Sequence, residues 1–282
     1  MIDPWGSRLG FMQGRLSPQV NGTIQAFPWD HWEHEFAVAS RLGMKLMEWT
    51  LDQDRLLENP LLTVSGRRRI RELELSHGVR VASVTGDNFM QAPFCKADER
   101  DRAARLAEFR AVIDSCGEMG IPLMVFPLVD NGAIESAAQL QALRRGFEEA
   151  VPWLRQARVR IAFETELPPG EVAELFEMFS SDCFGWNYDI GNSAAMGFDP
   201  AQELTVNGRR ILNVHVKDRK LGGTTVPLGT GDADLPKVLS LLVARGYRGN
   251  FILQTARAED GDHEGAIRRY RNLAAMWLDG TP

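Results

Sequence analysis

The sequence alternates short apolar runs with longer amphipathic segments from one end to the other, and this alternation limits its fold more than any other feature. Repeated units of this kind indicate a parallel sheet covered by helices. The expected strands are Arg8–Met12, Lys45–Glu48, Val79–Val84, Leu123–Phe126, Arg160–Glu164, Gly185–Asp189, Leu212–His215 and Asn250–Gln254. No Pro/Ser-rich linker interrupts them, so we expect residues 1–282 to form a single (β/α)8 barrel, a TIM barrel of the α/β class.

The segments between these runs carry helix signals. Glu99–Met119 and Ala138–Gln156 show apolar residues at helical spacing, with charged residues on the other face. Gly120 follows the first of them, and Gly246 follows a third expected helix, Leu235–Arg245. Both glycines stand where a helix ends in a left-handed cap.

The composition narrows the classes of partner. A formal net charge of -6 and a pI near 5.5 argue against a nucleic-acid surface, so a small molecule is the expected partner. Cys95, Cys116 and Cys183 are scattered, which predicts neither a disulfide framework nor a thiolate zinc site. The sequence shows no signal peptide and no apolar run long enough for a membrane span. We therefore expect a cytoplasmic protein without a membrane partner, and a homo-oligomer remains open.

Four consecutive expected strands each end in a residue that can bind a metal. These residues are Glu164, Asp189, His215 and Gln254. One such residue alone is more often a loop cap or a satisfied polar group, but the carboxyl ends of neighbouring parallel strands meet at one rim of a barrel. Carboxylate, imidazole and amide oxygen ligands suit Mn²⁺, Mg²⁺, Co²⁺ or Zn²⁺. The pattern therefore predicts one divalent metal ion.

Several stretches make the chain resemble the xylose-isomerase-like TIM-barrel superfamily, which includes sugar phosphate isomerases and epimerases. They are Gly10–Leu16, Phe163–Leu167, Asp189–Asn192, His215–Arg219, Leu228–Gly231 and Ile252–Thr255. The resemblance covers essentially the whole chain and implies Glu164, Asp189, His215 and Gln254 as the metal ligands. Family members often carry glutamate at the last position. Glutamine still offers an amide oxygen to a metal, but it cannot transfer a proton.

Three residues near these ligands are candidates for substrate binding. Glu166 points the same way as Glu164 if the strand continues, although a solvated loop carboxylate is as good an interpretation. Asn192 stands where related ketose epimerases have a substrate-binding histidine. Lys217 would project beside His215, where it could neutralise an enediolate or simply pair with an acid. We therefore treat Lys217 as a second catalytic candidate after Glu164.

Further candidates come from the other strand ends. Glu48 ends the second expected strand and Asp87 follows the third, so both are expected to line the same mouth, although either could be structural. Arg15, in the Gly10–Leu16 stretch, is a further substrate-binding candidate. The turn 227–232 precedes a helix, so its backbone amides could hold a phosphate.

Aromatic side chains gather at the same expected strand ends. They could form the wall of a sugar-sized pocket, although core packing is the commoner role of such residues. The residues are Trp5, Phe11, Trp49, Phe89 and Phe126.

The resemblance implies a metal-dependent isomerase or epimerase of a sugar or sugar phosphate. Such enzymes bind both oxygens of an α-hydroxy-carbonyl at the metal, and a carboxylate then takes the adjacent proton to give an enediolate. With Gln254 in place of a second carboxylate, we expect one-base isomerisation or a dehydration, unless Glu48, Glu166 or Lys217 supplies the second proton. An inosose-type cyclitol dehydratase and a non-catalytic sugar-binding barrel remain alternatives. A DNA-repair endonuclease would need more histidines and a basic groove.

Overall fold

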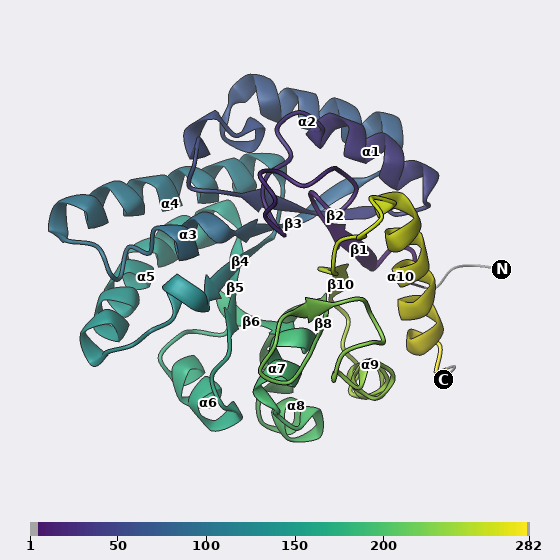
Figure 1. Cartoon of the computed structure of the whole chain (residues 1–282). Helices are drawn as coiled ribbons and strands as arrows, with labels where there is room; N and C mark the ends of the chain where they lie inside the picture. The colour runs from purple at the N-terminus through teal and green to yellow at the C-terminus, as the bar shows by residue number, and fades with distance from the viewer. Residues whose placement is uncertain (1–4, 281–282) are drawn as a thin grey trace.

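Eight parallel strands close into a barrel in the computed structural model, which describes residues 5–280 (Figure 1). Around the barrel the order is β1-β10-β7-β6-β5-β4-β3-β2. The barrel strands are β1 Leu9–Met12, β2 Leu46–Leu51, β3 Arg80–Gly86, β4 Leu123–Leu128, β5 Arg160–Thr165, β6 Phe184–Asp189, β7 Ile211–Val216 and β10 Asn250–Leu253. The expected (β/α)8 barrel is therefore confirmed.

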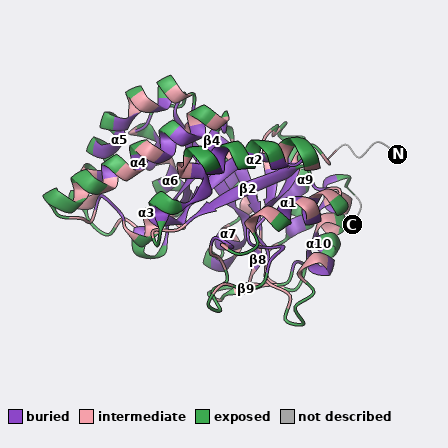
Figure 2. Ribbon diagram, turned by 90° about the horizontal axis from the view of Figure 1, so that it is seen from above, coloured by how far each residue is buried: buried purple, intermediate pink, exposed green. Residues whose placement is uncertain are grey.

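Helices surround this barrel, with exposed outer faces and buried inner faces (Figure 2). The α-helices are α1 Trp32–Arg41, α2 Val64–His77, α3 Asp87–Gln91, α4 Glu99–Met119, α5 Ala137–Ala157, α6 Pro169–Glu177, α7 Ile190–Met196, α8 Pro200–Asn207, α9 Leu235–Ala244 and α10 His263–Leu278. Short 3₁₀ helices are η1 Leu56–Glu58, η2 Pro60–Leu62, η3 Asp130–Gly132 and η4 Gly208–Arg210. A small antiparallel hairpin, β8 Asp218–Arg219 with β9 Thr225–Val226, follows β7 at the barrel mouth.

The local signals in the sequence explain where the helices end. Gly120 closes α4 with φ 71° and Gly246 follows α9 with φ 75°, both in the left-handed region expected of them. Asp98 and Ser136 cap the other ends of α4 and α5 by accepting backbone N–H groups. These caps satisfy amides that the helices themselves leave unpaired.

Aromatic rings fill the layer between the strands and α4, α5 and α6. Phe126 stacks on Phe89 at a centroid distance of 4.8 Å, and Phe147 packs against Phe163 at 5.1 Å. Of the two roles considered for Phe11, Trp49, Phe89 and Phe126, core packing is the one observed, because each is at most 3% exposed and belongs to the hydrophobic core. Trp5, which is not fully buried, packs its ring edge on Phe251 at 6.2 Å.

The alternation of side chains along β6 directs its residues to two places. Asn187 and Asp189 point toward the barrel interior, where they contact groups from β5 and β7. Tyr188, between them, points outward to α8. One strand therefore supplies both the barrel centre and the helical layer.

Among residues 5–280, no helix is both long enough and apolar enough to cross a membrane.

Candidate metal and sugar site

Three of the expected ligands meet at the carboxyl ends of β5, β6 and β7. Asp189 and His215 are direct partners in the β6–β7 register. The His215 Nδ1 atom lies 3.1 Å from Glu164 Oε2 and 3.7 Å from Asp189 Oδ2. One ligand atom from each residue falls within 4.8 Å of the others, and all three side chains are buried. Such a cluster of carboxylates and imidazole has the composition of a divalent metal site.

The fourth expected ligand, Gln254, follows directly after β10. Its Nε2 atom donates to Gln25 Oε1 at 3.2 Å, whereas its Oε1 atom is buried without a hydrogen-bond partner in the described residues. Buried polar atoms are rarely left unpaired, because the lost hydration costs about 1–3 kcal/mol. An amide oxygen in this position, directly after the strand that pairs with β7, is suited to act as a further metal ligand.

Glu48 orients the His215 ring. The Nε2–H group donates to Glu48 Oε1 at 2.7 Å, and Asn187 Nδ2 approaches the Nδ1 atom at 3.1 Å. With Nε2 held by Glu48, Nδ1 is the ring atom that faces Glu164 and Asp189 and the one that would bind a metal. Ser83 and Asn213 occupy the other Glu48 oxygen. Glu48 is 0% exposed, so the expectation that it lines the mouth is wrong: it lies behind His215.

The charges around His215 favour a cation at this point. Burial alone lowers the pKa of His215, but the carboxylates of Glu48, Asp189 and Glu164 raise it well above its ordinary value. Burial likewise opposes ionisation of Asp189, yet Lys217 and His215 hold the pKa of that carboxyl below its usual range. The site thus attracts positive charge to the space between these side chains.

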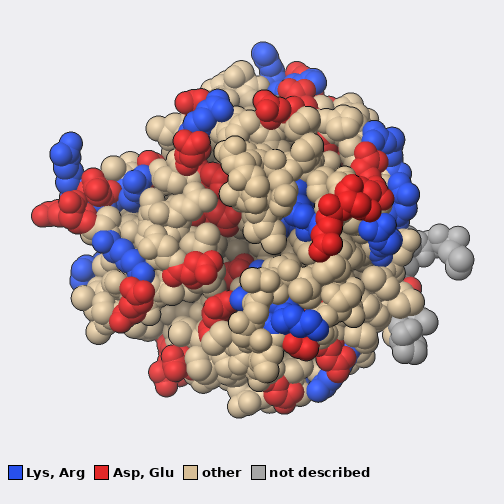
Figure 3. Space-filling model, in the orientation of Figure 1, with Lys and Arg blue, Asp and Glu red and all other residues tan. Residues whose placement is uncertain are grey.

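A pocket of about 610 Å³ opens above this cluster, within the range of small-ligand sites. In the space-filling view a hollow near the middle of this face has acidic and basic side chains on its rim (Figure 3). Seven of the residues expected at the site line the pocket: Arg15, Asp87, Glu164, Glu166, Asn192, Lys217 and Gln254. Asp189 and His215 are more deeply buried, at 3% and 0% exposure.

Lys217 and Asn192 stand beside Asp189 and Glu164. Lys217 Nζ donates to Asp189 Oδ2 at 3.2 Å and to Asn192 Oδ1 at 3.0 Å. Asn192 Nδ2 in turn donates to Glu164 Oε1 at 3.0 Å. Arg219, which the sequence analysis did not single out, donates to Asn192 Oδ1 at 2.8 Å and to Glu166 Oε1 at 2.7 Å. The sequence feature that could have identified Arg219 is its place in the His215–Arg219 stretch, four residues after His215.

A loop between β1 and α1 forms another side of the pocket. Arg15 donates to the carbonyl oxygens of Thr255 and Ile24 and to Gln25 Oε1. Gln25 donates through Nε2 to Asp87 Oδ2 at 2.5 Å and accepts from Gln254. Arg15 therefore holds this loop in place, and Gln25 links Asp87 to Gln254. No motif in the sequence pointed to Gln25.

Burial also changes the acidity of Asp87. It raises the pKa of Asp87 to about 7, with a smaller contribution from the nearby negative charges of Asp52 and Glu164. Burial therefore favours the protonated form of Asp87.

The turn 227–232 does not offer a phosphate site. The amides of Gly229 and Gly231 both donate to Asp218 Oδ2 at 2.8 Å, and the amide of Ala233 donates to Asp218 Oδ1. Asp218 is 0% exposed, and a Cβ atom on Gly231 would lie 1.9 Å from its carboxylate. The expected anion is thus a side chain of the protein itself.

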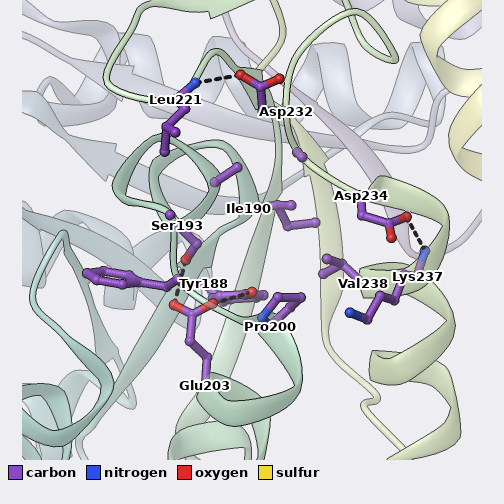
Figure 4. A pocket seen from close by; sticks show the side chains of 14 residues that line it. Tyr188, Ile190, Ser193, Pro200, Glu203, Leu221, Asp232, Asp234, Lys237 and Val238 are labelled. Atoms are coloured by element: carbon purple, nitrogen blue, oxygen red, sulfur yellow. Dashed lines mark hydrogen bonds between the residues drawn. The ribbon is translucent and has the colours of Figure 1, made fainter.

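A second pocket, of about 480 Å³, lies outside the barrel between α7, α8 and α9 (Figure 4). Glu203 reaches its floor and accepts hydrogen bonds from Tyr188 and Ser193, at 2.9 and 2.7 Å. Asp234 and Lys237 come from the start of α9 on its other side. We call this region the lateral pocket.

Comparisons with known proteins identify relatives of this chain. Residues 36–276 match the family described as xylose isomerase-like TIM barrel. The L-ribulose-5-phosphate 3-epimerase UlaE of Escherichia coli O1:K1 is 28% identical over 253 residues, which cover 84% of this chain and 87% of that protein.

Two solved structures share the fold. The IOLI protein with a bound zinc atom superposes with a TM-score of 0.75 at 18% identity, covering 96% of this chain and 98% of the other. D-Psicose 3-epimerase from Clostridium cellulolyticum H10, solved with D-tagatose, gives a TM-score of 0.71 at 12% identity, covering 96% and 99%.

Proposed function

Because the chain belongs to the xylose isomerase-like TIM barrel family, we propose that it is a divalent-metal-dependent isomerase or epimerase of a sugar or sugar phosphate. The observation that carries this proposal is the convergence of Glu164, Asp189 and His215 beneath a sugar-sized pocket, next to the unpaired Gln254 oxygen. The names of the relatives, a ketose phosphate epimerase and a ketose epimerase, agree with this class.

Glu164, Asp189, His215 and Gln254 would hold the metal. The donor set suits it, since two carboxylates, one imidazole nitrogen and one amide oxygen are ligands that Mn²⁺, Mg²⁺, Co²⁺ and Zn²⁺ accept. When bound, such an ion polarises a substrate carbonyl and so acidifies the neighbouring C–H bond.

Glu164 is the proposed base. Its carboxylate lines the pocket, and Asn187 and Asn192 donate to its two oxygens, which fixes its orientation. Lys217 places an ammonium group on the same side, where it stabilises negative charge that develops on a substrate oxygen. Proton removal next to the carbonyl then yields an enediolate, the intermediate common to isomerisation and epimerisation.

The charges of the pocket favour an uncharged sugar over a sugar phosphate. Lys217 pairs with Asp189, and Arg219 pairs with Glu166 and the Gly223 carbonyl. Arg15 is bound to backbone carbonyls. Each cation lining the described pocket is thus already committed, and a phosphate would have to break one of these pairs. Hydroxyl groups can share such partners without displacing them.

A cyclitol dehydratase of the inosose type is the second candidate. Its first step is the same proton abstraction, and Gln254 in place of an acid favours it over a symmetric two-base epimerase. Gln254 also keeps a non-catalytic sugar-binding barrel possible.

Deuterium incorporation tests the proposal. The Mn²⁺-loaded protein would be incubated in heavy water with ketopentoses, ketohexoses, their phosphates and inososes, and each would be followed by proton NMR. We expect exchange at the carbon next to the carbonyl of at least one neutral sugar, and loss of this exchange by at least about 100-fold in Glu164→Gln. Sugar binding without exchange would support the non-catalytic barrel, and water loss from an inosose would support the dehydratase.

A further inference from the structure

Asp87 differs from Glu166 and Asp189 because no lysine or arginine among residues 5–280 forms an ion pair with it. Glu166 is held by Arg219 at 2.7 Å, Asp189 by Lys217 at 3.2 Å, and Glu48 lies behind His215. Asp130, at the rim, is exposed. The hydrogen bonds to the Asp87 side chain come from Gln25 at 2.5 Å and, weakly, from Thr85 at 3.5 Å.

Gln25 connects this carboxylate to the position where a second acid is missing. Gln254 Nε2 donates to Gln25 Oε1, and Gln25 Nε2 donates to Asp87 Oδ2. The chain Gln254–Gln25–Asp87 follows one wall of the pocket, while Glu164 lies on another strand, β5. Asp87 is therefore an acidic group separated by a single hydrogen-bonded side chain, Gln25, from position 254, where an acid is lacking.

On the basis of the proposed function, we infer that Asp87 is the second acid–base group of the reaction. It exchanges a proton with the substrate face that Glu164 does not reach. Asp87 lines the pocket, and its Oδ1 atom receives only the long contact from Thr85, which leaves that oxygen with bonding capacity for a substrate. The environment agrees with this role, since burial brings the pKa of Asp87 to about 7, where a group can both donate and accept a proton.

The proton balance is simple. Glu164 removes the proton from the carbon next to the carbonyl, and the electron pair of that C–H bond becomes the double bond of the enediolate. Protonated Asp87 then gives its proton to the opposite face of the same carbon, which forms the new C–H bond and leaves Asp87 as a carboxylate. Exchange with solvent returns Glu164 and Asp87 to their starting states. The net reaction is epimerisation, and no oxidant or further reactant is needed.

Asp87→Asn is the informative variant. The asparagine Oδ1 atom can still accept from Gln25, so the loop keeps its anchor while proton transfer is lost. The probe is the ketose that exchanges deuterium fastest with the unmodified Mn²⁺-loaded protein. We expect the variant to keep one-face exchange catalysed by Glu164 and to form the epimer at least about 100-fold more slowly. Its KM and its Mn²⁺ affinity, measured by calorimetry, should stay within about threefold.

Matched controls separate the possible failures. Asp54→Asn changes an exposed carboxylate that does not line this pocket and should leave epimer formation within about twofold. Asp87→Glu restores an acid and should recover part of the epimerisation. Undiminished epimer formation in Asp87→Asn would overturn the inference while the proposed function stands, and so would an isomerised aldose as the only product of the unmodified protein. Absence of any exchange in the unmodified protein would instead overturn the proposed function.

Discussion

One face of strand β6 contributes to the cluster beneath the pocket at the barrel mouth, and the other face contributes to the lateral pocket. The buried acids on these two faces are hydrogen-bonded differently. On the outer face of β6, Tyr188 donates to one oxygen of Glu203, and Ser193 donates to the other. On the inner face, Asp189 lies close to Glu164 and His215, and the oxygen of Gln254, which follows a strand paired with β7, has no hydrogen-bond partner among residues 5–280. A single strand thus carries a completed hydrogen-bond network on one side and an incomplete one on the other.

The difference separates structural acids from functional ones. A buried carboxylate is costly unless hydrogen bonds or opposite charge compensate it. Neutral donors from the protein itself bind both oxygens of Glu203. Around His215 the carboxylates of Glu48, Glu164 and Asp189 share one imidazole, and Lys217 pairs with Asp189. A divalent cation would relieve this crowding of like charges. The incomplete network therefore indicates where a ligand contributes to stability.

Asp189→Asn tests this contrast with the largest expected effect. The change keeps the size of the side chain and the hydrogen bond from the Asn192 amide, but it removes one of two anionic ligands. We expect Mn²⁺ affinity to fall by at least about 100-fold, because charge attraction dominates binding of a divalent ion. Calorimetric titration with Mn²⁺ measures it.

The matched control is Glu203→Gln, which neutralises a buried carboxylate on the opposite face of the same strand. It should leave Mn²⁺ affinity within about twofold. Equal losses in both variants would mean that the inner cluster has no special role in metal binding.

Gln254→Glu should change the Mn²⁺ affinity in the direction opposite to Asp189→Asn. Adding a negative charge next to Glu164 and Asp189 should make the metal-free protein less stable and the metal complex tighter. We expect Mn²⁺ affinity to rise by about tenfold and the thermal midpoint without metal to fall. An unchanged affinity in calorimetry would exclude Gln254 from the coordination shell.

The sequence was sufficient for the barrel and for the meeting of Glu164, Asp189 and His215 at one rim of it. The four strands expected to end in a ligand, β5, β6, β7 and β10, end within about one residue of the expected position, whereas β2 runs on past Glu48 to Leu51. Asp189 and His215 fall side by side because the register of β6 and β7 is fixed by burial on both faces. A ligand pattern that repeats at successive strand ends can be recognised even when the predicted strand boundaries are wrong by a residue or so. This is why the rim could be predicted without coordinates.

Contacts between distant segments could not be predicted in the same way. Glu48 seemed to face the mouth, but the pairing shift between Met47 and Glu48 against β3 and the bond to His215 place it inside the barrel. The turn 227–232 looked like an anion site, and only the fold reveals that Asp218 already occupies its amides. Gln25 reaches the pocket from a loop with no periodic pattern.

The smallest expected effect belongs to Glu203→Gln, measured as stability at two pH values. Burial raises the pKa of Glu203 above its ordinary value, so the folded state holds this proton more tightly than the unfolded state does. The stabilisation linked to Glu203 is therefore complete at low pH and is lost as the pH rises through the folded-state pKa. Glutamine has no such dependence. Relative to the parent protein, the variant should be less stable by about 1 kcal/mol at pH 4 and should recover that difference by pH 8, as measured by urea unfolding.

The same variant is also the strictest test of the separation between the two pockets. Tyr188 and Asp189 are adjacent on β6, so a shift of the Tyr188 ring could be transmitted to the metal cluster. If each face of the strand acts independently, sugar exchange by the Mn²⁺-loaded variant stays within about twofold of the parent rate at both pH values. A loss of tenfold or more, with Mn²⁺ affinity unchanged, would show that the lateral network positions the catalytic groups, and the two regions would then have to be treated as one site.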